Sequence, residues 1–421
     1  MPTATANASA VTAPATTALV ARQPILDRDK ILYGYELLYR ARREDTHAEI
    51  RSRDAASVSV MLRACVDIGL SRLVGASPAF INVTRGLILD PSLLPQNGER
   101  LILEILEDEI IDDTLIGALR QLRARGYRIA LDDFVHSPHA PLQPSLLELA
   151  HYVKLDVLAH TPGELAAAVR KLRAWPAKLI AEKVETHEQF EQCHALGFDG
   201  FQGYYLFRPE ITTEPVLGEN RLSVLRLLSA VQNADTGADE LESIIRHDAV
   251  LSYKLLRVVN SAYFALRTQV QSIRHAIVYL GMARVRSWVQ MLALANLEDR
   301  PSELLKAALV RGRVCELLAS DMAPEQREYA FTVGLFSLLD ALLNVPMTQL
   351  LENLPVAEPV RVALLRGEGP WARMLSEHGH YETGAWQELH PLRLSVVGTA
   401  YLEAVEWAEQ VFVGLNAPGP A

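Results

Sequence analysis

The sequence predicts two domains, an α/β barrel followed by an all-α helical domain. Up to about residue 212, short apolar runs such as "AFINV", "RIALD" and "YVKLD" alternate with helix-like segments. Helical crossovers between apolar strands indicate a parallel sheet, which closes most economically as a barrel. Beyond "RPEITTEPVLGEN" this alternation stops, and residues 218 to 410 read as consecutive amphipathic helices. A domain boundary is therefore predicted near residue 212.

The composition argues against several classes of protein. The chain has 421 residues, of which 49% are hydrophobic and 22% are charged, as in ordinary soluble proteins with two cores. A formal charge of -10 argues against non-specific binding to nucleic acid or to an anionic membrane. No run approaches the roughly 18 apolar residues of a membrane span. The 3 cysteines lack a CxxC spacing, which favours a reducing cytoplasm and no thiolate metal site.

The elements of the barrel follow in order along the chain. Residues 1–17 are rich in Ala, Thr and Pro and are predicted to form a disordered tail. The runs "LVARQPI" and "ILYGYELLYR" predict a hairpin around the polar turn "LDRDK". A helix is predicted over residues 52 to 74, and strands and helices then alternate as far as "GFQGYYL", with Gly126 and Gly197 each ending a helix.

Polar residues recur at the carboxyl ends of the predicted strands. In parallel barrels these ends meet at one rim, where catalytic residues are found. The residues at these ends, spaced at similar intervals, are Glu36, Asn82, Glu104, Asp132 with Asp133, Lys154, Glu182 and Gln202. Several carboxylates converging on one rim would be costly without a cation or a ligand.

The residue types at this rim favour a hard divalent cation. Those that precede Asp133 offer only oxygen ligands, which suit Mg²⁺ or Mn²⁺ better than zinc. Asp133 could bridge to a second ion, and two such ions clamp the attacking and leaving oxygens of an in-line phosphoryl displacement. Taken alone, the aspartate pair has an alternative interpretation, in which one residue caps the next turn and the other is solvated.

Three further residues could complete a phosphoryl-transfer site. Lys154 could orient a water molecule or offset phosphate charge, and Glu182 could bind a metal or orient the same water. Arg40, four residues after Glu36, could reach a ligand phosphate. Its spacing is equally compatible with a solvated charge on the rim.

Ordered motifs in the first domain resemble those of EAL domains, TIM-like barrels that bind and hydrolyse cyclic di-GMP. Within residues 18–212 they are "ARQPILDRDKILYGYELLYR", "FINVT", "LEILE", "ALDDF", "VKLD", "AEKVE" and "FQGYYLFRP". The resemblance implies cyclic di-GMP as substrate, the linear dinucleotide pGpG as product, and two divalent ions, Mg²⁺ or Mn²⁺. Barrels of this type often form homodimers.

The same resemblance implies roles for individual residues. The implied metal ligands are Glu36, Asn82, Glu104, Asp132 and Asp133. Lys154 and Glu182 would act at the water molecule, and Glu107 would brace the loop after the aspartates. The residues implied to contact the dinucleotide are Gln23, Arg40 and Gln202.

Three departures from the EAL pattern affect the surroundings of the site. Leu37 stands where the signature has alanine, and Lys183 replaces the glycine of "AEGVE". Active members follow the aspartate pair with glycine, whereas this chain has Val135 in "DDFVHSPHAPLQP", a segment stiffened by three prolines. Loss of such support can cost roughly 10- to 100-fold in metal affinity or activity.

Residues 213–410 resemble the HDOD domain, a relative of HD metal phosphohydrolases that lacks their metals. The best signatures are "VVNSAYF" and "AIVYLGMARVRSWV", and the second predicts two helices hinged at Gly281. His247 and Asp248 form an adjacent His-Asp pair, but that superfamily carries its pair in a later helix, where Ser337 and Leu338 stand. The pair is therefore not predicted to bind metal.

Two short segments of the second domain carry predictions of their own. The segment "SEHGHYE" is predicted to be a surface loop, with its histidines, His378 and His380, not paired as ligands. Residues 411–421 are predicted to be a flexible C-terminal tail.

Two functions follow from the sequence. In the first, the barrel is a metal-dependent phosphodiesterase that opens cyclic di-GMP, and the helical domain regulates it. In the second, a degenerate barrel senses the dinucleotide or serves as a scaffold, and the helical domain contacts a partner protein. The rim residues favour the first function, and the altered loop after Asp133 favours the second.

Overall fold

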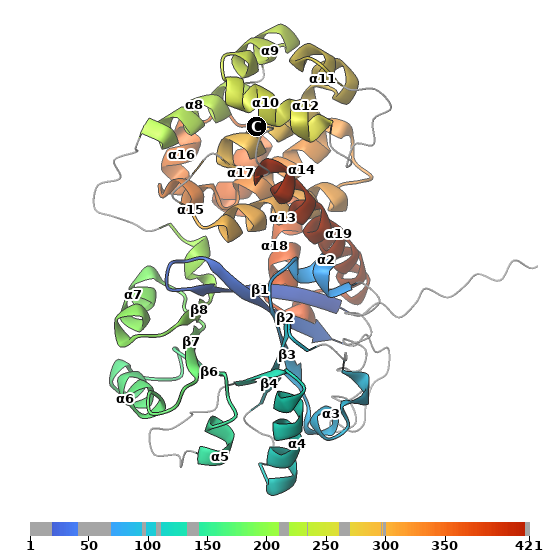
Figure 1. Cartoon of the computed structure of the whole chain (residues 1–421). Coiled ribbons are helices and arrows are strands. Elements are labelled where there is room, and N and C mark those ends of the chain that lie inside the picture. Colours follow the sequence, from blue (N-terminus) through green and yellow to red (C-terminus); the bar gives the residue numbers. More distant parts are fainter. Residues whose placement is uncertain are drawn as a thin grey trace, which may run out of the picture.

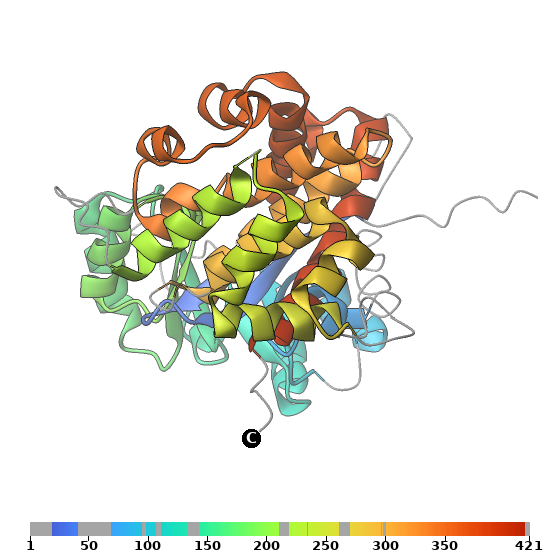
Figure 2. The same ribbon diagram turned by 90° about the horizontal axis from the view of Figure 1, so that it is seen from above.

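A computed structural model gives the structure of the protein (Figure 1). The residues that it describes are 19–40, 69–94, 98–106, 111–132, 143–209, 219–233, 235–260, 270–295, 297 and 300–416. A barrel forms from the first half of the chain, and a helical domain, residues 219–416, lies over it when seen from above (Figure 2). The predicted α/β barrel followed by an all-α domain is therefore confirmed.

In the part of the chain that the structure describes, eight strands close the barrel in sequence order. Their bounds are β1 Leu19–Asp27, β2 Leu32–Arg40, β3 Ala79–Val83, β4 Leu101–Ile105, β5 Arg128–Leu131, β6 Tyr152–Asp156, β7 Lys178–Glu182 and β8 Gly200–Gln202. Strand β1 is antiparallel to both β2 and β8, and the remaining neighbours are parallel. The predicted hairpin is confirmed. Asp27 Oδ1 holds its turn by accepting hydrogen bonds of 2.9 Å from the N–H groups of Asp29 and Ile31.

Helices and short 3₁₀ turns surround the strands. Their bounds are α2 Leu70–Val74, α3 Arg85–Leu89, η2 Pro91–Leu93, α4 Asp113–Ala124, α5 Pro144–Leu147, α6 Pro162–Leu172, α7 His187–Leu196 and η3 Tyr204–Phe207. Of the helix predicted over residues 52 to 74, α2 is described and residues 52–68 lie outside the described residues. Gly197 ends α7 in the left-handed conformation, φ 92°, as its predicted role requires.

The interior of the barrel is apolar below the rim. One residue from each of six strands fills it, namely Ile25, Phe80, Ile102, Ala130, Tyr152 and Ile180. Side chains alternate between the two faces of a strand, so the next inward position on each parallel strand lies two residues later. On the five parallel strands that contribute to this layer, those positions are Asn82, Glu104, Asp132, Lys154 and Glu182. The strand period therefore places the predicted polar residues in one layer above the apolar one.

The second domain is entirely helical where it is described. The bounds of its helices are α8 Glu219–Gln232, α9 Ala238–Arg246, α10 Ala249–Val259, α11 Ile273–Leu280, α12 Met282–Ala295, α13 Ser302–Leu318, α14 Pro324–Phe336, α15 Leu339–Leu343, α16 Met347–Asn353, α17 Glu358–Arg366, α18 Gly369–Glu382, η4 Trp386–Glu388 and α19 Pro391–Asn416. The predicted hinge at Gly281 is confirmed, because this residue separates α11 from α12 with φ 84°. None of the described helices is both long and apolar enough to cross a membrane.

Close helix packing explains why the second domain extends past residue 410. Helices α13 and α14 cross at glycine, since a Cβ atom on Gly334 would lie 2.3 Å from the Arg311 carbonyl oxygen. Helix α19 continues to Asn416, so the first six residues of the predicted flexible tail, 411–416, are helical. It does so because Ala408 and Val411 are buried in the core of the domain.

The adjacent His247 and Asp248 serve as helix ends. Asp248 caps α10, and its Oδ1 accepts a hydrogen bond of 2.9 Å from the Leu251 N–H. His247 follows the last residue of α9, and its exposed ring lies with Nδ1 2.6 Å from the Ser243 carbonyl oxygen. The pair thus has a structural explanation that needs no metal.

The surface loop predicted at His378 and His380 is wrong, because both residues lie within α18. His378 is 0% exposed, and neither of its ring nitrogens has a hydrogen-bond partner in the described part of the chain. Glu382 Oε2 lies 4.0 Å from Nδ1. Burial lowers the pKa of His378 to about 4, although the nearby Glu382 favours the charged ring.

This buried histidine predicts a loss of stability in acid. The unfolded chain binds the proton below about pH 6.5 and the folded chain only below about pH 4. The free energy of unfolding should therefore fall by about 3 kcal/mol over this interval, at most. His378→Leu should flatten that part of the profile when urea unfolding is followed between pH 4 and 7. His380→Leu, in the same helix, is the matched control, and equal slopes in wild type and His378→Leu would contradict the prediction.

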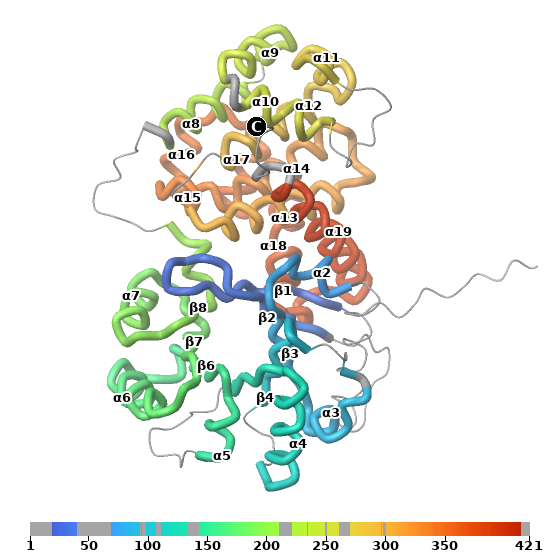
Figure 3. The backbone as a smooth tube through the Cα atoms, in the orientation of Figure 1, coloured from blue at the N-terminus to red at the C-terminus, as the bar shows by residue number. Residues whose placement is uncertain are grey.

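Strand β1 belongs to both domains. Leu19 and Ala21 are buried in the core of the helical domain, while Val20 and Leu26 are buried in the core of the barrel. Helices α18 and α19 contact β1, and α19 also contacts α2. In the backbone trace the blue β1–β2 hairpin and the red α19 lie next to each other (Figure 3). The helical domain thus covers a part of the barrel that has no crossover helix of its own.

Candidate functional site

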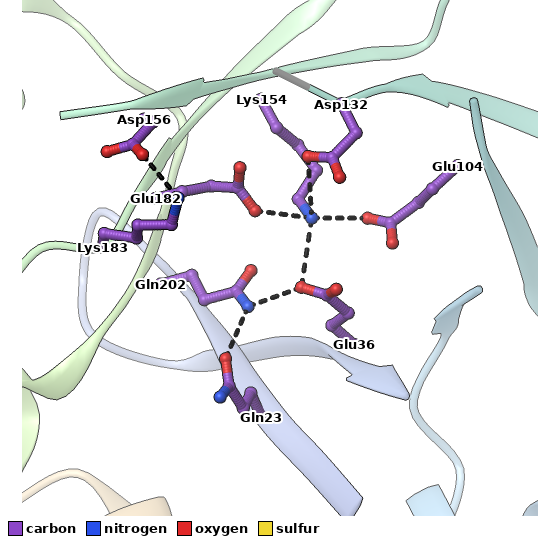
Figure 4. A network of polar contacts seen from close by, with 9 residues as sticks. All are labelled: Gln23, Glu36, Glu104, Asp132, Lys154, Asp156, Glu182, Lys183 and Gln202. Carbon is purple, nitrogen blue, oxygen red and sulfur yellow. Dashed lines mark hydrogen bonds and ion pairs between the residues drawn. The ribbon is translucent and has the colours of Figure 1, made fainter. Parts of the chain in front are cut away.

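The centre of the polar layer is the side chain of Lys154, which is 0% exposed. Its Nζ atom lies within 4 Å of four described carboxylates, which come from β2, β4, β7 and the end of β5 (Figure 4). The distances are 2.6 Å to Glu182 Oε1, 2.7 Å to Glu104 Oε1, 3.1 Å to Glu36 Oε2 and 3.5 Å to Asp132 Oδ1. One buried cation therefore faces several acidic groups.

Glutamines extend this cluster toward β1. Gln202 Nε2 donates to Glu36 Oε2 over 2.6 Å and to Gln23 Oε1 over 3.0 Å (Figure 4). Gln23 lies opposite Glu36 in the β1–β2 hairpin, and Asn82 forms a further side-chain hydrogen bond with Glu36. Residues from both sides of the closure between β1 and β8 thus meet at Glu36.

Burial and the excess of carboxylates over lysine shift the pKa values of these groups. Burial raises the pKa of Glu182 to about 8 and that of Glu104 well above its usual range, despite the nearby charge of Lys154. For Glu36, burial opposes ionisation, but the charge of Lys154 and hydrogen bonds from Gln202 and Asn82 outweigh it and lower the pKa. Burial also opposes the charge on Lys154, yet the surrounding carboxylates raise its pKa well above the usual value. Additional positive charge would be stabilised here.

Several oxygens of this layer are buried without a hydrogen bond from any described residue. They are Asn82 Oδ1, Glu104 Oε1 and Oε2, Asp132 Oδ1 and Gln202 Oε1. Glu104 Oε1 does form an ion pair of 2.7 Å with Lys154 Nζ. Carboxylate and amide oxygens are the donors that Mg²⁺ and Mn²⁺ prefer, so the donor chemistry fits a hard divalent cation.

No cluster of three or more His, Cys, Asp or Glu side chains among the described residues is arranged to hold a metal ion. The carboxylates instead converge on the ammonium group of Lys154. Asp133, the residue predicted to bridge two ions, lies outside the described residues.

The structure brings together eight of the residues singled out in the sequence. They are Gln23, Glu36, Asn82, Glu104, Asp132, Lys154, Glu182 and Gln202. Glu107, Asp133 and Val135 lie outside the described residues. For Arg40 the structure describes the position at the end of β2 but not the side chain.

One ion pair at the rim was not predicted. Lys183, which follows β7, donates to Asp156 Oδ2 at the end of β6 (Figure 4). Lys183 adopts φ 53°, a left-handed conformation that is costly for a residue with a Cβ atom. Its replacement of glycine in "AEKVE" was visible in the sequence, and Asp156 ends the motif "VKLD". Their pairing depends on the contact between β6 and β7.

Gly203 directly follows Gln202 and packs closely against the backbone of Val184. It has φ 149° and ψ -175°, and a Cβ atom there would lie 2.2 Å from the Val184 carbonyl oxygen. Gly203→Ala should therefore destabilise the protein by about 2–4 kcal/mol, through backbone strain and overpacking. Thermal and urea unfolding measure this loss.

A matched control exists in the same domain. Gly117 lies inside α4, and a Cβ atom there would meet nothing within 4 Å. Gly117→Ala should stabilise the protein by roughly 0.5–1 kcal/mol. If the two variants change stability in the same direction, the steric argument for Gly203 is wrong.

Comparisons with known proteins agree with this architecture. Residues 65–209 match the EAL domain family, and residues 221–354 match the HDOD domain family. The cyclic di-GMP phosphodiesterase CdgJ of Vibrio cholerae is 33% identical over 94% of this chain and 93% of its own length. The uncharacterized protein YuxH of Bacillus subtilis is 30% identical over 93% of this chain and 98% of its own length.

Solved structures also resemble the chain, but weakly. Klebsiella pneumoniae BlrP1, solved with calcium and cyclic di-GMP, is 22% identical with a TM-score of 0.36, over 46% of this chain and 57% of the BlrP1 chain. The likeness to BlrP1 is too low to carry an argument about this chain. Both family matches and the two full-length relatives support one conclusion. The chain belongs to the family of two-domain proteins in which an EAL domain is followed by an HDOD domain.

Proposed function

We propose that the barrel binds cyclic di-GMP and hydrolyses it to linear pGpG with divalent cations. The observation that carries this proposal is the convergence of Glu36, Glu104, Asp132 and Glu182 in one buried layer, with oxygens that lack hydrogen-bond partners among the described residues. A buried excess of carboxylates calls for added cations. The similarity to CdgJ, named a cyclic di-GMP phosphodiesterase, extends over both domains and supports the same substrate.

The residues of the site would have different roles in cation binding, water activation and dinucleotide binding. The proposed cation ligands are Glu36, Asn82, Glu104, Asp132 and Asp133. Mg²⁺ or Mn²⁺ bound there would polarise a phosphoryl oxygen and supply an activated water. Lys154 holds the Glu182 carboxylate at 2.6 Å, which suits this pair for orienting a water molecule. Gln23 and Gln202, at the β1–β8 closure, and Arg40 would contact the dinucleotide.

The second candidate function is that of a cyclic di-GMP sensor without turnover. Two features favour it. Val135 replaces the glycine that active EAL domains have after the aspartate pair, and Lys183 occupies a left-handed position that suits glycine. Binding needs the glutamines and the rim charges, whereas turnover also needs well-placed cations. In either case the helical domain would carry the signal to a partner protein.

One experiment separates these functions. The purified chain is incubated with cyclic di-GMP and either Mg²⁺ or Mn²⁺, pGpG is measured by chromatography, and dinucleotide binding is measured in parallel by calorimetry. An enzyme should release pGpG in wild type and not in Glu36→Ala. Binding without release of pGpG under every metal condition would reject the enzyme and support the sensor function. Neither binding nor pGpG would reject both functions.

A further inference from the structure

The first and last strands of the barrel, β1 and β8, pair along only a short segment. Residues Ile25–Asp27 of β1 pair with residues Gly200–Gln202 of β8, while the preceding residues of β1 pair only with β2. In an antiparallel strand, every second residue directs its N–H and C=O groups to the same side. On the open edge of β1 these residues include Val20 and Arg22, and the next in this alternation, Pro24, has no N–H group. Such an edge needs other partners.

Two tyrosines of the helical domain supply these partners. The Tyr381 hydroxyl, from α18, accepts a hydrogen bond from the Val20 N–H and donates one to the Val20 carbonyl, both 3.2 Å long. The Tyr401 hydroxyl, from α19, accepts one from the Arg22 N–H, also 3.2 Å long. Both tyrosine side chains are buried. They take the place of the strand that would otherwise pair with this edge.

The side chain of Arg22 reinforces the same contact. Its guanidinium lies 4.3 Å from the centre of the Tyr35 ring, forms an ion pair of 3.1 Å with Glu409 of α19, and donates to the Leu73 carbonyl. The Tyr35 hydroxyl in turn donates to Glu303 of α13. Strand β1 is therefore held to the helical domain at consecutive edge positions, directly before Gln23.

The other side of the closure is tied to the same domain. Arg311 of α13 forms an ion pair of 2.9 Å with Glu382 of α18 and donates to the Tyr204 hydroxyl over 3.4 Å. Its guanidinium also lies 5.3 Å from the centre of the Phe207 ring. Tyr204 begins η3, two residues after Gln202. A pocket lined by Gln23, Gly203, Tyr204 and Glu382, among others, lies between the two attachments.

These contacts lie next to the candidate site. Gln23 directly follows Arg22 on β1, and it accepts a hydrogen bond from Gln202, which also donates to Glu36. We propose that Tyr381 and Tyr401 are positioning residues, which hold the edge of β1 so that Gln23 and Gln202 meet at Glu36 in the geometry that binds the dinucleotide. This inference rests on the proposed binding of cyclic di-GMP. Binding free energies are linked, so dinucleotide binding must in turn strengthen the contact of β1 with α18 and α19.

The test compares wild type with a Tyr381→Phe/Tyr401→Phe double variant, which keeps both rings and removes only their hydroxyl groups. Cyclic di-GMP binding is measured by calorimetry in EDTA, so that no turnover occurs. The dissociation constant of the double variant should rise about tenfold, within the usual range of coupling between sites. The single variants should each show part of this loss. Tyr329→Phe is the matched control, because its hydroxyl bonds to Glu325 of its own helix, and its affinity should equal that of wild type.

Hydrogen exchange provides a readout that a purely structural role would not change. Cyclic di-GMP should slow exchange in α18 and α19 of wild type, and should do so less in the double variant. An affinity of the folded double variant within twofold of wild type, or equal protection in both proteins, would overturn the inference and leave the proposed function standing. A wild-type chain that fails to bind cyclic di-GMP would reject the proposed function and this inference with it.

Discussion

Replacing Lys154 by methionine is expected to destabilise the protein by about 3–5 kcal/mol at pH 8 in the absence of divalent cations. Methionine is similar in size, so the change removes the buried charge and little of the volume. The carboxylates of Glu36, Glu104, Asp132 and Glu182 then face one another without their common cation. The cost should shrink toward pH 5, because burial raises the pKa values of Glu104 and Glu182 and protonation of these two residues relieves the repulsion.

The same variant tests whether the site accepts cations. Mn²⁺ or Mg²⁺ should raise the thermal midpoint of Lys154→Met by more than that of wild type, since added positive charge replaces the lost ammonium group. Lys306→Met is the control, because Lys306 is also a buried lysine with two acidic partners, Glu303 at 3.0 Å and Glu409 at 3.4 Å, but lies at the domain junction. It should lose stability without rescue by divalent cations. Equal cation effects in both variants, or an unchanged stability of Lys154→Met, would contradict the proposed role of this layer.

Much of the barrel could be predicted because a strand pattern depends on local sequence. The alternation of side chains fixes which residues face inward. Asn82 lies two residues after Phe80, and Lys154 two residues after Tyr152, so each polar residue shares the inward face with an apolar one. The turn of the first hairpin and the hinge at Gly281 were likewise visible as local signals. Much of the candidate site could be predicted for the same reason, because most of its residues lie at strand ends.

The central position of Lys154 could not be predicted in the same way. The spacing placed it on the rim, but only the closure of the barrel shows that its ammonium group reaches carboxylates from across the ring. The attachment of β1 to the helical domain is even harder to predict from the sequence, because Val20 and Tyr381 are 361 residues apart. His378 was misplaced because the polar and glycine-containing segment "SEHGHYE" has loop composition, and tertiary burial of α18 overrides that composition.

Glu104→Gln is expected to separate cation binding from stability. Glu104 is 0% exposed, and neither of its carboxylate oxygens has a hydrogen-bond partner among the described residues. Because burial raises its pKa well above the usual value, folded wild type keeps a proton on Glu104 that the unfolded chain releases as pH rises, and folding then requires proton uptake. That requirement is absent below the pKa of the unfolded residue and grows as pH rises. Glutamine removes it, so the metal-free variant should be as stable as wild type near pH 4.5 and more stable at pH 8.

Cation affinity should move in the opposite direction. An amide cannot supply the negative charge of a carboxylate ligand, and the affinity for Mn²⁺ should fall at least about tenfold. Calorimetric Mn²⁺ titration and urea unfolding in EDTA at both pH values measure the two effects in the same protein. Glu377→Gln is the matched control, because Glu377 is buried in the helical domain and pairs with Arg393, so its loss should lower stability and leave Mn²⁺ affinity unchanged. A Glu104→Gln variant that loses stability with rising pH, or keeps its Mn²⁺ affinity, would show that the Glu104 carboxylate stabilises the barrel and does not bind a cation.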